Sequence, residues 1–223
     1  MNLTDQVHKV IKDEITTCVL EPGQQISQLQ LSQRYGFGLT PVREALRRLA
    51  QEGLVQSVPR FGYIVSSITL CDVREIFELR SILELAAVRL AVVRGTQEQL
   101  ETIAQDAGFT YVYRDRKSYS DFLVHNAEFH RSIAILSDNR RLIDQISRLL
   151  NEMTRIFHLG LDLKDSAQEM HDEHVALAEA ILQRDANLAE HLVQSQIVRS
   201  QERVLEAMTS RFAALERTVK INP

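Results

Sequence analysis

The sequence predicts a mainly α-helical protein, with an N-terminal winged helix-turn-helix followed by an all-α bundle of about six helices. Two observations lead to this fold class. Helix-breaking residues crowd the first part of the chain, where seven of the eight glycines and three of the four prolines precede residue 109. Beyond about residue 69, apolar residues recur every three or four positions with few interruptions, a pattern typical of packed amphipathic helices. We therefore expect two domains, over residues 1–68 and 69–216.

The first two elements are helices separated by a turn. Apolar residues recur with helical period from Leu3 to Cys18, which predicts a first helix that stops at the Pro-Gly turn of residues 21–23. A second, short helix follows around Gln28–Tyr35. It ends at Gly36, since glycine is the usual residue after a helix C-terminus.

A third helix and a hairpin complete the predicted N-terminal domain. Thr40 is a good N-cap, and Pro41 suits the first helical position, where no N–H is needed. This helix is expected to end at Gly53. Two short strands, Leu54–Val58 and Tyr63–Val65, then flank a turn. The order helix, helix, turn, helix, hairpin is that of a winged helix-turn-helix.

The third helix has one apolar and one charged face. The residues with helical spacing that must face a core are Val42, Ala45, Leu46 and Leu49. Those left outward are Arg43, Glu44, Arg47 and Arg48. Such a face can be an ordinary solvated surface, but in a helix-turn-helix context it is typical of a recognition helix in the DNA major groove. Arginines one turn apart can bind a guanine edge or a phosphate.

Polar residues with helical spacing also mark the predicted bundle. Asn126 and His130 share a helix face, His171 and His174 lie three positions apart, and Gln196 follows. A single helical histidine is most often a solvated or core residue. Two converging histidine-bearing faces can instead bind a metal ion. The residues leave both interpretations open.

Arg80 and Glu84 also allow two interpretations. Their spacing suits a salt bridge on the surface of a helix. Alternatively, Arg80 lies inside the bundle, where its guanidinium would bind a carboxylate through two hydrogen bonds.

Composition excludes several classes of protein. The chain of 223 residues is 44% hydrophobic and 25% charged, with a net charge of −4, which argues against a protein that coats nucleic acid. There is no apolar run long enough for a membrane span and no apolar signal core, so we expect a cytoplasmic protein. The two cysteines, Cys18 and Cys71, are expected to be buried free thiols.

The N-terminal stretch EPGQQISQLQLSQRYGFGLTPVREALRRLAQEGLVQSVPRFGYIV resembles the DNA-binding domain of the GntR family of bacterial repressors. The Thr-Pro-Val-Arg-Glu-Ala-Leu core, the Glu-Gly-Leu-Val helix exit and the Arg-x-Gly wing carry the resemblance. It implies a homodimer that binds a palindromic operator in double-stranded DNA. It places Thr40 and Arg43 at DNA-contacting positions, and Gly62 at the wing glycine that approaches the minor groove.

The chain departs from the family pattern just before Thr40. Gly38 and Leu39 stand where the family usually has Ser-Arg. Leucine cannot donate a hydrogen bond, although it can contact a thymine methyl group. We therefore expect an altered operator, with Arg43, Arg47 and Arg60 carrying more of the contact.

The second half resembles the FCD effector domain of the FadR subfamily. The pattern runs from Asp72 through Arg80 and Glu84, then Asn126-x-x-Phe129-His130, then Glu173-His174. The resemblance implies a divalent metal, zinc or nickel, held at the positions of Asn126, His130 and His174, with Gln196 where a third histidine is expected. Asn and Gln are weak ligands for such ions, so the metal is expected to be weakly bound or absent.

The sequence thus predicts a transcriptional regulator that acts as a repressor and is controlled by a small organic acid. The expected effector-binding residues are Arg80, His130 and His174. Two alternatives remain: an effector-independent dimeric DNA-binding protein, and a metal-dependent hydrolase. We expect no enzyme, because the sequence has no Gly-rich phosphate loop and no nucleophile elbow.

Overall fold

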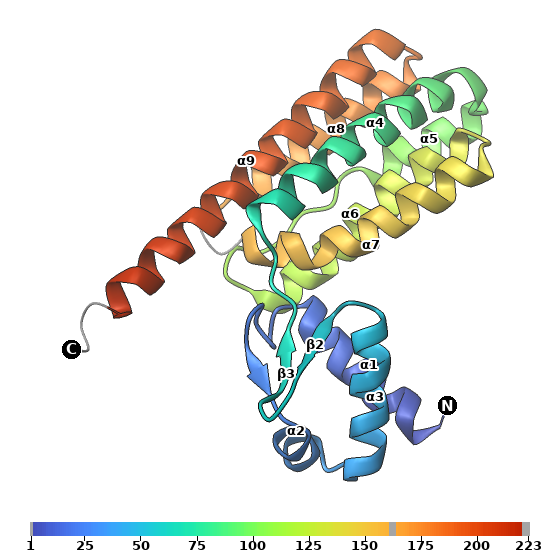
Figure 1. Cartoon of the computed structure of the whole chain (residues 1–223). Helices are drawn as coiled ribbons and strands as arrows, with labels where there is room; N and C mark the ends of the chain where they lie inside the picture. Colours follow the sequence, from blue (N-terminus) through green and yellow to red (C-terminus); the bar gives the residue numbers. More distant parts are fainter. Residues whose placement is uncertain (1, 161–163, 220–223) are drawn as a thin grey trace. The chain divides into compact units, whose positions relative to one another are not determined.

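The chain folds into two compact units, Met1–Thr69 and Leu70–Pro223. The computed structural model describes residues 2–160 and 164–219. A three-stranded sheet and short helices make up the first unit, and helices make up the second (Figure 1). The predicted fold class is confirmed.

The first unit contains one strand more than the sequence predicts. Its elements are α1 (Leu3–Thr16), β1 (Gln25–Ile26), α2 (Gln28–Tyr35), α3 (Leu39–Gln51), β2 (Val55–Val58) and β3 (Gly62–Val65). The extra strand β1 pairs antiparallel with β3, which also pairs with β2, so the sheet order is β1-β3-β2. A strand of two residues has no apolar alternation of its own, so only its partner makes it recognisable.

Two predicted helix ends are wrong. The third helix begins at Leu39, and its N-cap is Gly38, which offers no side-chain hydrogen bond. Thr40 therefore lies in the first turn instead of capping the helix. The first helix ends at Thr16, well before the predicted turn, because Cys18 takes a left-handed backbone conformation with φ of 54°.

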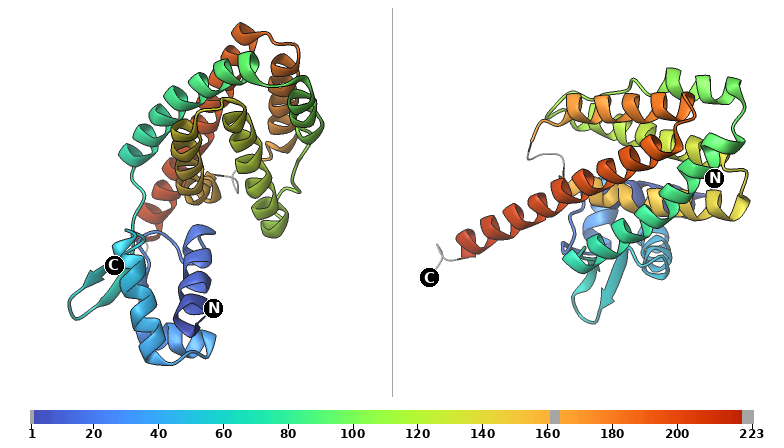
Figure 2. Two further views of the ribbon diagram at one scale, coloured as in Figure 1. Left: turned by 90° about the vertical axis from the view of Figure 1, so that its right-hand side faces the viewer. Right: turned by 90° about the horizontal axis from the view of Figure 1, so that it is seen from above.

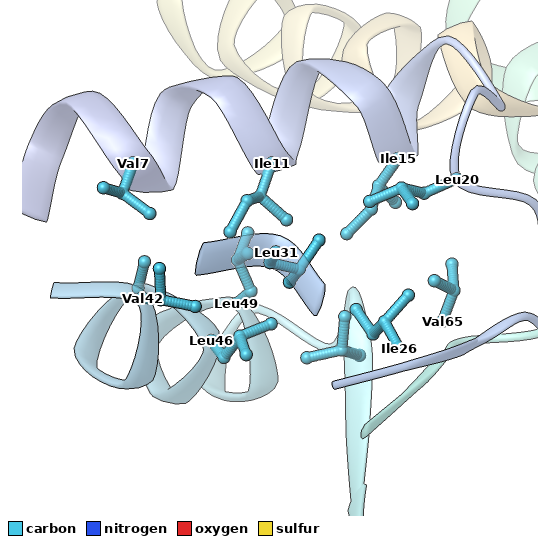
Figure 3. Packing of buried hydrophobic residues seen from close by; sticks show 12 residues of the cluster. Val7, Ile11, Ile15, Leu20, Ile26, Leu31, Val42, Leu46, Leu49 and Val65 are labelled. Carbon is cyan, nitrogen blue, oxygen red and sulfur yellow. The ribbon is translucent and has the colours of Figure 1, made fainter. Parts of the chain in front are cut away.

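The core of the first unit lies between α1 and α3 (Figure 3). Val42, Ala45, Leu46 and Leu49 of α3 are completely buried, as their spacing predicts. In Figure 3 the side chains of Val7, Ile11 and Ile15 from α1 point toward them, with Leu31 of α2 between the two helices. The opposite face of α3 is therefore free to carry polar side chains.

The second unit is a bundle of helices. Those in the described residues are α4 (Leu70–Arg94), α5 (Gln97–Asp106), α6 (Arg116–Leu136), α7 (Arg140–Gly160), α8 (Ala167–Leu182) and α9 (Ala186–Val219). Capping side chains define several N-termini; Thr96 and Gln99 form a reciprocal capping box at α5, and Asp115 accepts two backbone N–H bonds at α6.

Helix α4 is central to this bundle, since it packs against α9, α6 and α7. It runs beside α9 (Figure 1), and the C-terminal turns of α9 extend beyond the other helices of the unit (Figure 2). Because α4 has helices on several sides, even its polar residues can be buried. This is the setting of Arg80 and Glu84, whose side chains are only 2% and 3% exposed.

The two cysteines differ in burial. Cys18 is buried, but Cys71 is exposed at the start of α4, so the prediction that both are buried is wrong for Cys71. The position of Cys71 in the sequence pattern did not show which face of α4 it occupies, because α4 has apolar residues on all sides. Neither cysteine is in a disulfide. Within the described residues, no helix is both long and apolar enough to cross a bilayer.

Candidate functional site

The outer face of α3 presents the polar residues that the sequence singles out. Thr40, Arg43 and Arg47 are exposed. The Arg43 side chain is 60% exposed, and its nearest carboxylate, that of Glu44, is 3.9 Å away. Arg48 differs, because its Nη1 donates to Asp5 Oδ1 of α1 at 2.7 Å. Three of the polar groups on α3 are thus available for an external partner, while Arg48 is engaged.

The wing is the hairpin between β2 and β3, and its tip has a fixed backbone. Arg60 and Gly62 both have positive φ, 68° and 91°. A Cβ atom on Gly62 would lie 2.9 Å from the carbonyl oxygen of Ile26, so no other residue fits there without a shift. The Gln25 side-chain amide donates to the carbonyl of Phe61 at 2.7 Å. This hydrogen bond ties the wing tip to β1.

Two exposed apolar side chains flank this surface. Leu39, at the start of α3, is 52% exposed, and Phe61, at the wing tip, is 63% exposed. Leu39 lies where the GntR resemblance expects an arginine, so the surface offers an apolar contact in its place. The sequence analysis missed Phe61, although its place inside the Arg-x-Gly wing signals exposure.

Inside the helical unit, Arg80 lies in a closed network with two other polar side chains. Its Nε donates to Glu84 Oε1 at 2.7 Å, and its Nη2 lies 3.1 Å from His130 Nε2. His130 Nδ1 is 2.9 Å from Glu84 Oε2. The Arg80 guanidinium can only donate, so His130 accepts at Nε2, while Glu84 Oε2 has a close contact with His130 but no hydrogen-bond partner among the described residues.

Both interpretations of Arg80 and Glu84 are therefore partly right: the pair is a salt bridge along one helix, and it is buried inside the bundle. Burial alone would raise the pKa of Glu84. Arg80 and His130 more than offset this effect and lower the pKa to about 2. The carboxylate thus stays charged and holds the guanidinium in place.

A second pair lies next to this network. His174 Nε2 is 3.0 Å from Asn126 Oδ1, and the His174 ring lies 5.7 Å from the His130 ring, measured between centroids. Burial, and then the nearby His130, lower the pKa of His174 well below its usual value. His174 is consequently neutral and donates to Asn126. The structure thus brings together the three residues that the resemblance assigned to a metal, Asn126, His130 and His174.

A small pocket, with a cavity volume of about 20 Å³, lies beside Arg80 and Asn126. Its polar lining is Arg80, Asn126, Gln196, Ser200 and Arg203, and its apolar lining is Leu123, Phe157, Met170 and Val204. Neither His130 nor His174 lines it. Of the three predicted effector-binding residues, only Arg80 faces the pocket. His130 contacts Arg80, and His174 contacts Asn126, so the two histidines position residues that line the pocket.

The sequence analysis missed two polar residues of this pocket, Ser200 and Arg203. Both lie on α9 with Gln196, at the spacing i, i+4 and i+7 that defines one helix face. Extending the helical pattern from Gln196 would have found them.

Family models match most of the chain. Residues 75–199 match the FCD domain, and residues 3–65 match the bacterial regulatory proteins of the gntR family. The chain belongs to the GntR family. It is a DNA-binding transcriptional regulator whose second unit is an FCD effector-binding domain.

Several regulators are similar to this member of the family. It is 26% identical over 188 residues to the HTH-type transcriptional repressor RspR of Escherichia coli (strain K12), with 84% of this chain and 82% of that protein covered. It is 29% identical over 201 residues to a probable D-xylose utilization operon transcriptional repressor of Paenarthrobacter nicotinovorans, with 85% and 83% covered. The solved structure of E. coli McbR/YncC is 26% identical, with a TM-score of 0.64 over 95% of this chain and 99% of that one.

Some FCD domains bind a metal ion, but the donor set here does not fit one well. The Nε2 of His130 faces the Arg80 guanidinium at 3.1 Å, and a fixed cation there would repel a metal ion. Asn126 and Gln196 offer neutral amides in place of a carboxylate and an imidazole, which weakens binding of zinc or nickel. In the part of the chain that the structure describes, no three His, Cys, Asp or Glu side chains cluster to hold a metal.

Proposed function

We propose that this GntR-family regulator is a homodimeric repressor that leaves its palindromic operator when a small organic acid binds beside Arg80. The names of several relatives as repressors support the sign of regulation. On α4, the apolar residues Leu79, Ile82 and Val93 are exposed along one stripe, which supports dimerisation through the second unit. Such a regulator acts in the cytoplasm and needs no catalytic step.

The buried guanidinium of Arg80 is the observation that carries the acid-binding proposal. Among the described residues, only two of its N–H groups have a protein acceptor, on Glu84 and His130. The others remain available to the pocket that Arg80 lines. Phe157 covers the guanidinium at 5.7 Å from its ring centroid. A planar guanidinium held in this way matches a carboxylate in a bidentate geometry.

The proposed DNA contacts are Thr40, Arg43 and Arg47 on α3, with Arg60 and Gly62 on the wing. The exposure of the α3 side chains supports base and phosphate contacts in the major groove. The constrained backbone at Gly62 supports a close approach of the wing to the minor groove. Affinity for the operator should fall steeply as salt increases, because phosphate contacts release counterions.

Arg43→Ala should weaken operator binding by about 1–3 kcal/mol and relax specificity at one base pair. The reason is that the Arg43 side chain is 60% exposed and its contact with Glu44, at 3.9 Å, is long. An operator selected from random DNA, followed by fluorescence anisotropy, measures the loss. Arg48→Ala on the same helix is the matched control, because its guanidinium is held by Asp5. Equal losses in the two variants would remove Arg43 from the base-reading surface.

Acid binding should persist after treatment with a chelator and should be lost when Arg80 is replaced. Arg80→Met leaves Glu84 as an unpaired buried charge, so the variant to use is the double replacement Arg80→Met with Glu84→Leu, which removes both charges. Arg80→Lys keeps the charge without the planar fork and should bind more weakly than the natural protein. Calorimetry with short-chain carboxylic acids, in EDTA and without it, measures binding.

The same titrations define what would contradict the proposal. Unchanged acid affinity in the double variant would show that Arg80 is not the receptor of the acid. A metal centre would be indicated by two results together: loss of acid binding in EDTA, and a stoichiometric metal that is lost in His130→Ala and His174→Ala. An acid that tightens operator binding would reverse the sign of regulation.

A further inference from the structure

The tip of the wing carries an exposed phenyl ring. Phe61 lies between β2 and β3 and is 63% exposed. Of the phenylalanines whose burial the structure describes, it alone is exposed. Tyr63, the other aromatic residue of the hairpin, packs against the core of the first unit instead. Figure 2 shows the hairpin projecting from the helices of that unit. The ring of Phe61 therefore lies where an external partner can contact it.

The protein fixes the backbone that presents this ring. The Phe61 N–H donates to the carbonyl of Val58 at 3.1 Å, and its carbonyl accepts from the Gln25 side chain at 2.7 Å. The residues on either side, Arg60 and Gly62, both have positive φ. Because the polar backbone groups of Phe61 are both occupied inside the protein, only its ring remains for a partner. A side chain on a backbone held in this way loses less entropy when it binds.

A phenyl ring has few favourable contacts in a DNA groove. It has no donor for the acceptor atoms of adenine and thymine that line the minor groove, and none for a phosphate. On the floor of the groove it would displace water from those acceptors without replacing the hydrogen bonds. An apolar side chain between two base pairs, by contrast, unstacks the step and kinks the duplex. The chemistry of Phe61 thus favours insertion between bases over readout of base edges.

We propose that Phe61 enters the minor groove as a wedge, unstacks one base step in each half of the operator and bends the DNA. This inference rests on the proposed homodimer and on the proposed approach of its wings to the minor groove. The partner is a duplex with a deformable step under each wing, TA or CA/TG, since pyrimidine–purine steps unstack most easily. Phe61 thereby selects operators by their deformability, at a position where no base edge is read.

The first test measures the bend of an operator selected from random DNA, with donor and acceptor dyes at its two ends. The natural protein should bend this DNA by at least about 20°, the lower end of the range for apolar wedges. Phe61→Ala should abolish most of the bend. Phe61→Leu should keep part of it, because leucine also acts as a wedge. 2-Aminopurine in the deformed step should brighten with the natural protein, since unstacking raises its fluorescence, but not with Phe61→Ala.

A substitution in the DNA tests the preference for a deformable step. Replacing the pyrimidine–purine step with AA should weaken binding of the natural protein roughly tenfold, the size expected for one lost stacking contact. The same replacement should change the affinity of Phe61→Ala much less, because without the ring the step is not deformed. Fluorescence anisotropy with the two operators measures both affinities.

Two further variants separate the wedge from other effects. Arg60→Asn removes the neighbouring charge, and asparagine tolerates the positive φ of this position. It should weaken operator binding but keep the bend at saturating protein. Val112→Ala truncates an apolar side chain of the second unit that is 64% exposed, nearly as much as Phe61, and should change neither the bend nor the affinity. Circular dichroism confirms that each variant is folded.

Each outcome bears on one of two claims. The wedge is wrong if the natural protein leaves the operator straight, or if Phe61→Ala bends it equally. It is also wrong if Phe61→Leu bends no more than Phe61→Ala, or if Arg60→Asn loses the bend at saturation. In all of these cases the operator is still bound, so the proposed repressor function stands. If the selection yields no operator, that function itself is wrong, and the inference falls with it.

Discussion

Glu84→Gln should lower the free energy of unfolding of the FCD domain by about 3–5 kcal/mol, the usual cost of leaving one partner of a buried ion pair unpaired. The substitution removes the charge that compensates Arg80, whose side chain is 2% exposed. It also removes the negative charge that lies 2.9 Å from His130 Nδ1. Urea denaturation followed by circular dichroism measures the loss.

The bundle offers a matched control for this substitution. Arg89 and Glu190 form a similar pair between α4 and α9, but the Arg89 side chain is 66% exposed. Glu190→Gln should therefore cost only about 0–1 kcal/mol. The double replacement Arg80→Met with Glu84→Leu should recover most of the stability, because an apolar pair of similar volume needs no compensation. Equal losses in Glu84→Gln and Glu190→Gln would show that burial does not strengthen the pair.

The pH dependence of this effect has a defined sign. In the folded protein the pKa of Glu84 is about 2, below its ordinary value of 4.5. A lowered pKa means that the charged form stabilises the fold, fully above about pH 4.5, and that this stabilisation is lost as the pH falls toward 2. The difference in stability between the natural protein and Glu84→Gln should therefore shrink across that range.

The sequence could predict the DNA-binding unit almost completely, because its helices have one apolar and one polar face. Val42 and Leu46 are buried and Arg43 and Arg47 are exposed, as their spacing indicates. The strand β1 could not be predicted, because two residues carry no periodic signal. Its existence depends on β3, whose partners are set by the tertiary structure.

The pocket beside Arg80 could be predicted only in part. Spacing places Arg80 and Glu84 on one face of a helix, but α4 is apolar on several sides, so the pattern does not tell which face is buried. The distance of 3.1 Å between Arg80 and His130 joins residues fifty positions apart in sequence. No local pattern encodes such a contact, and it is the contact that argues against a metal on His130.

Leu46→Ala should destabilise the winged helix by about 2–5 kcal/mol, since it deletes a completely buried side chain and leaves a cavity. Operator binding should be lost with the fold of this unit. Leu39→Ala, on the same helix, is the matched control, because Leu39 is 52% exposed and its loss should change stability by at most about 0.5 kcal/mol. Thermal unfolding of both variants measures the difference.

The two leucines thus separate folding from recognition within one helix. Leu39→Ala leaves the winged helix intact, so any change in its operator preference reports a contact with DNA, such as one with a thymine methyl group. Leu46→Ala acts through stability, so cooling or a stabilising osmolyte should restore its operator binding in proportion to the folded fraction. A Leu46→Ala protein that unfolds like the natural one would mean that the core between α1 and α3 collapses around the deletion. In that case the rigidity of the recognition helix would have to come from its contacts with the sheet.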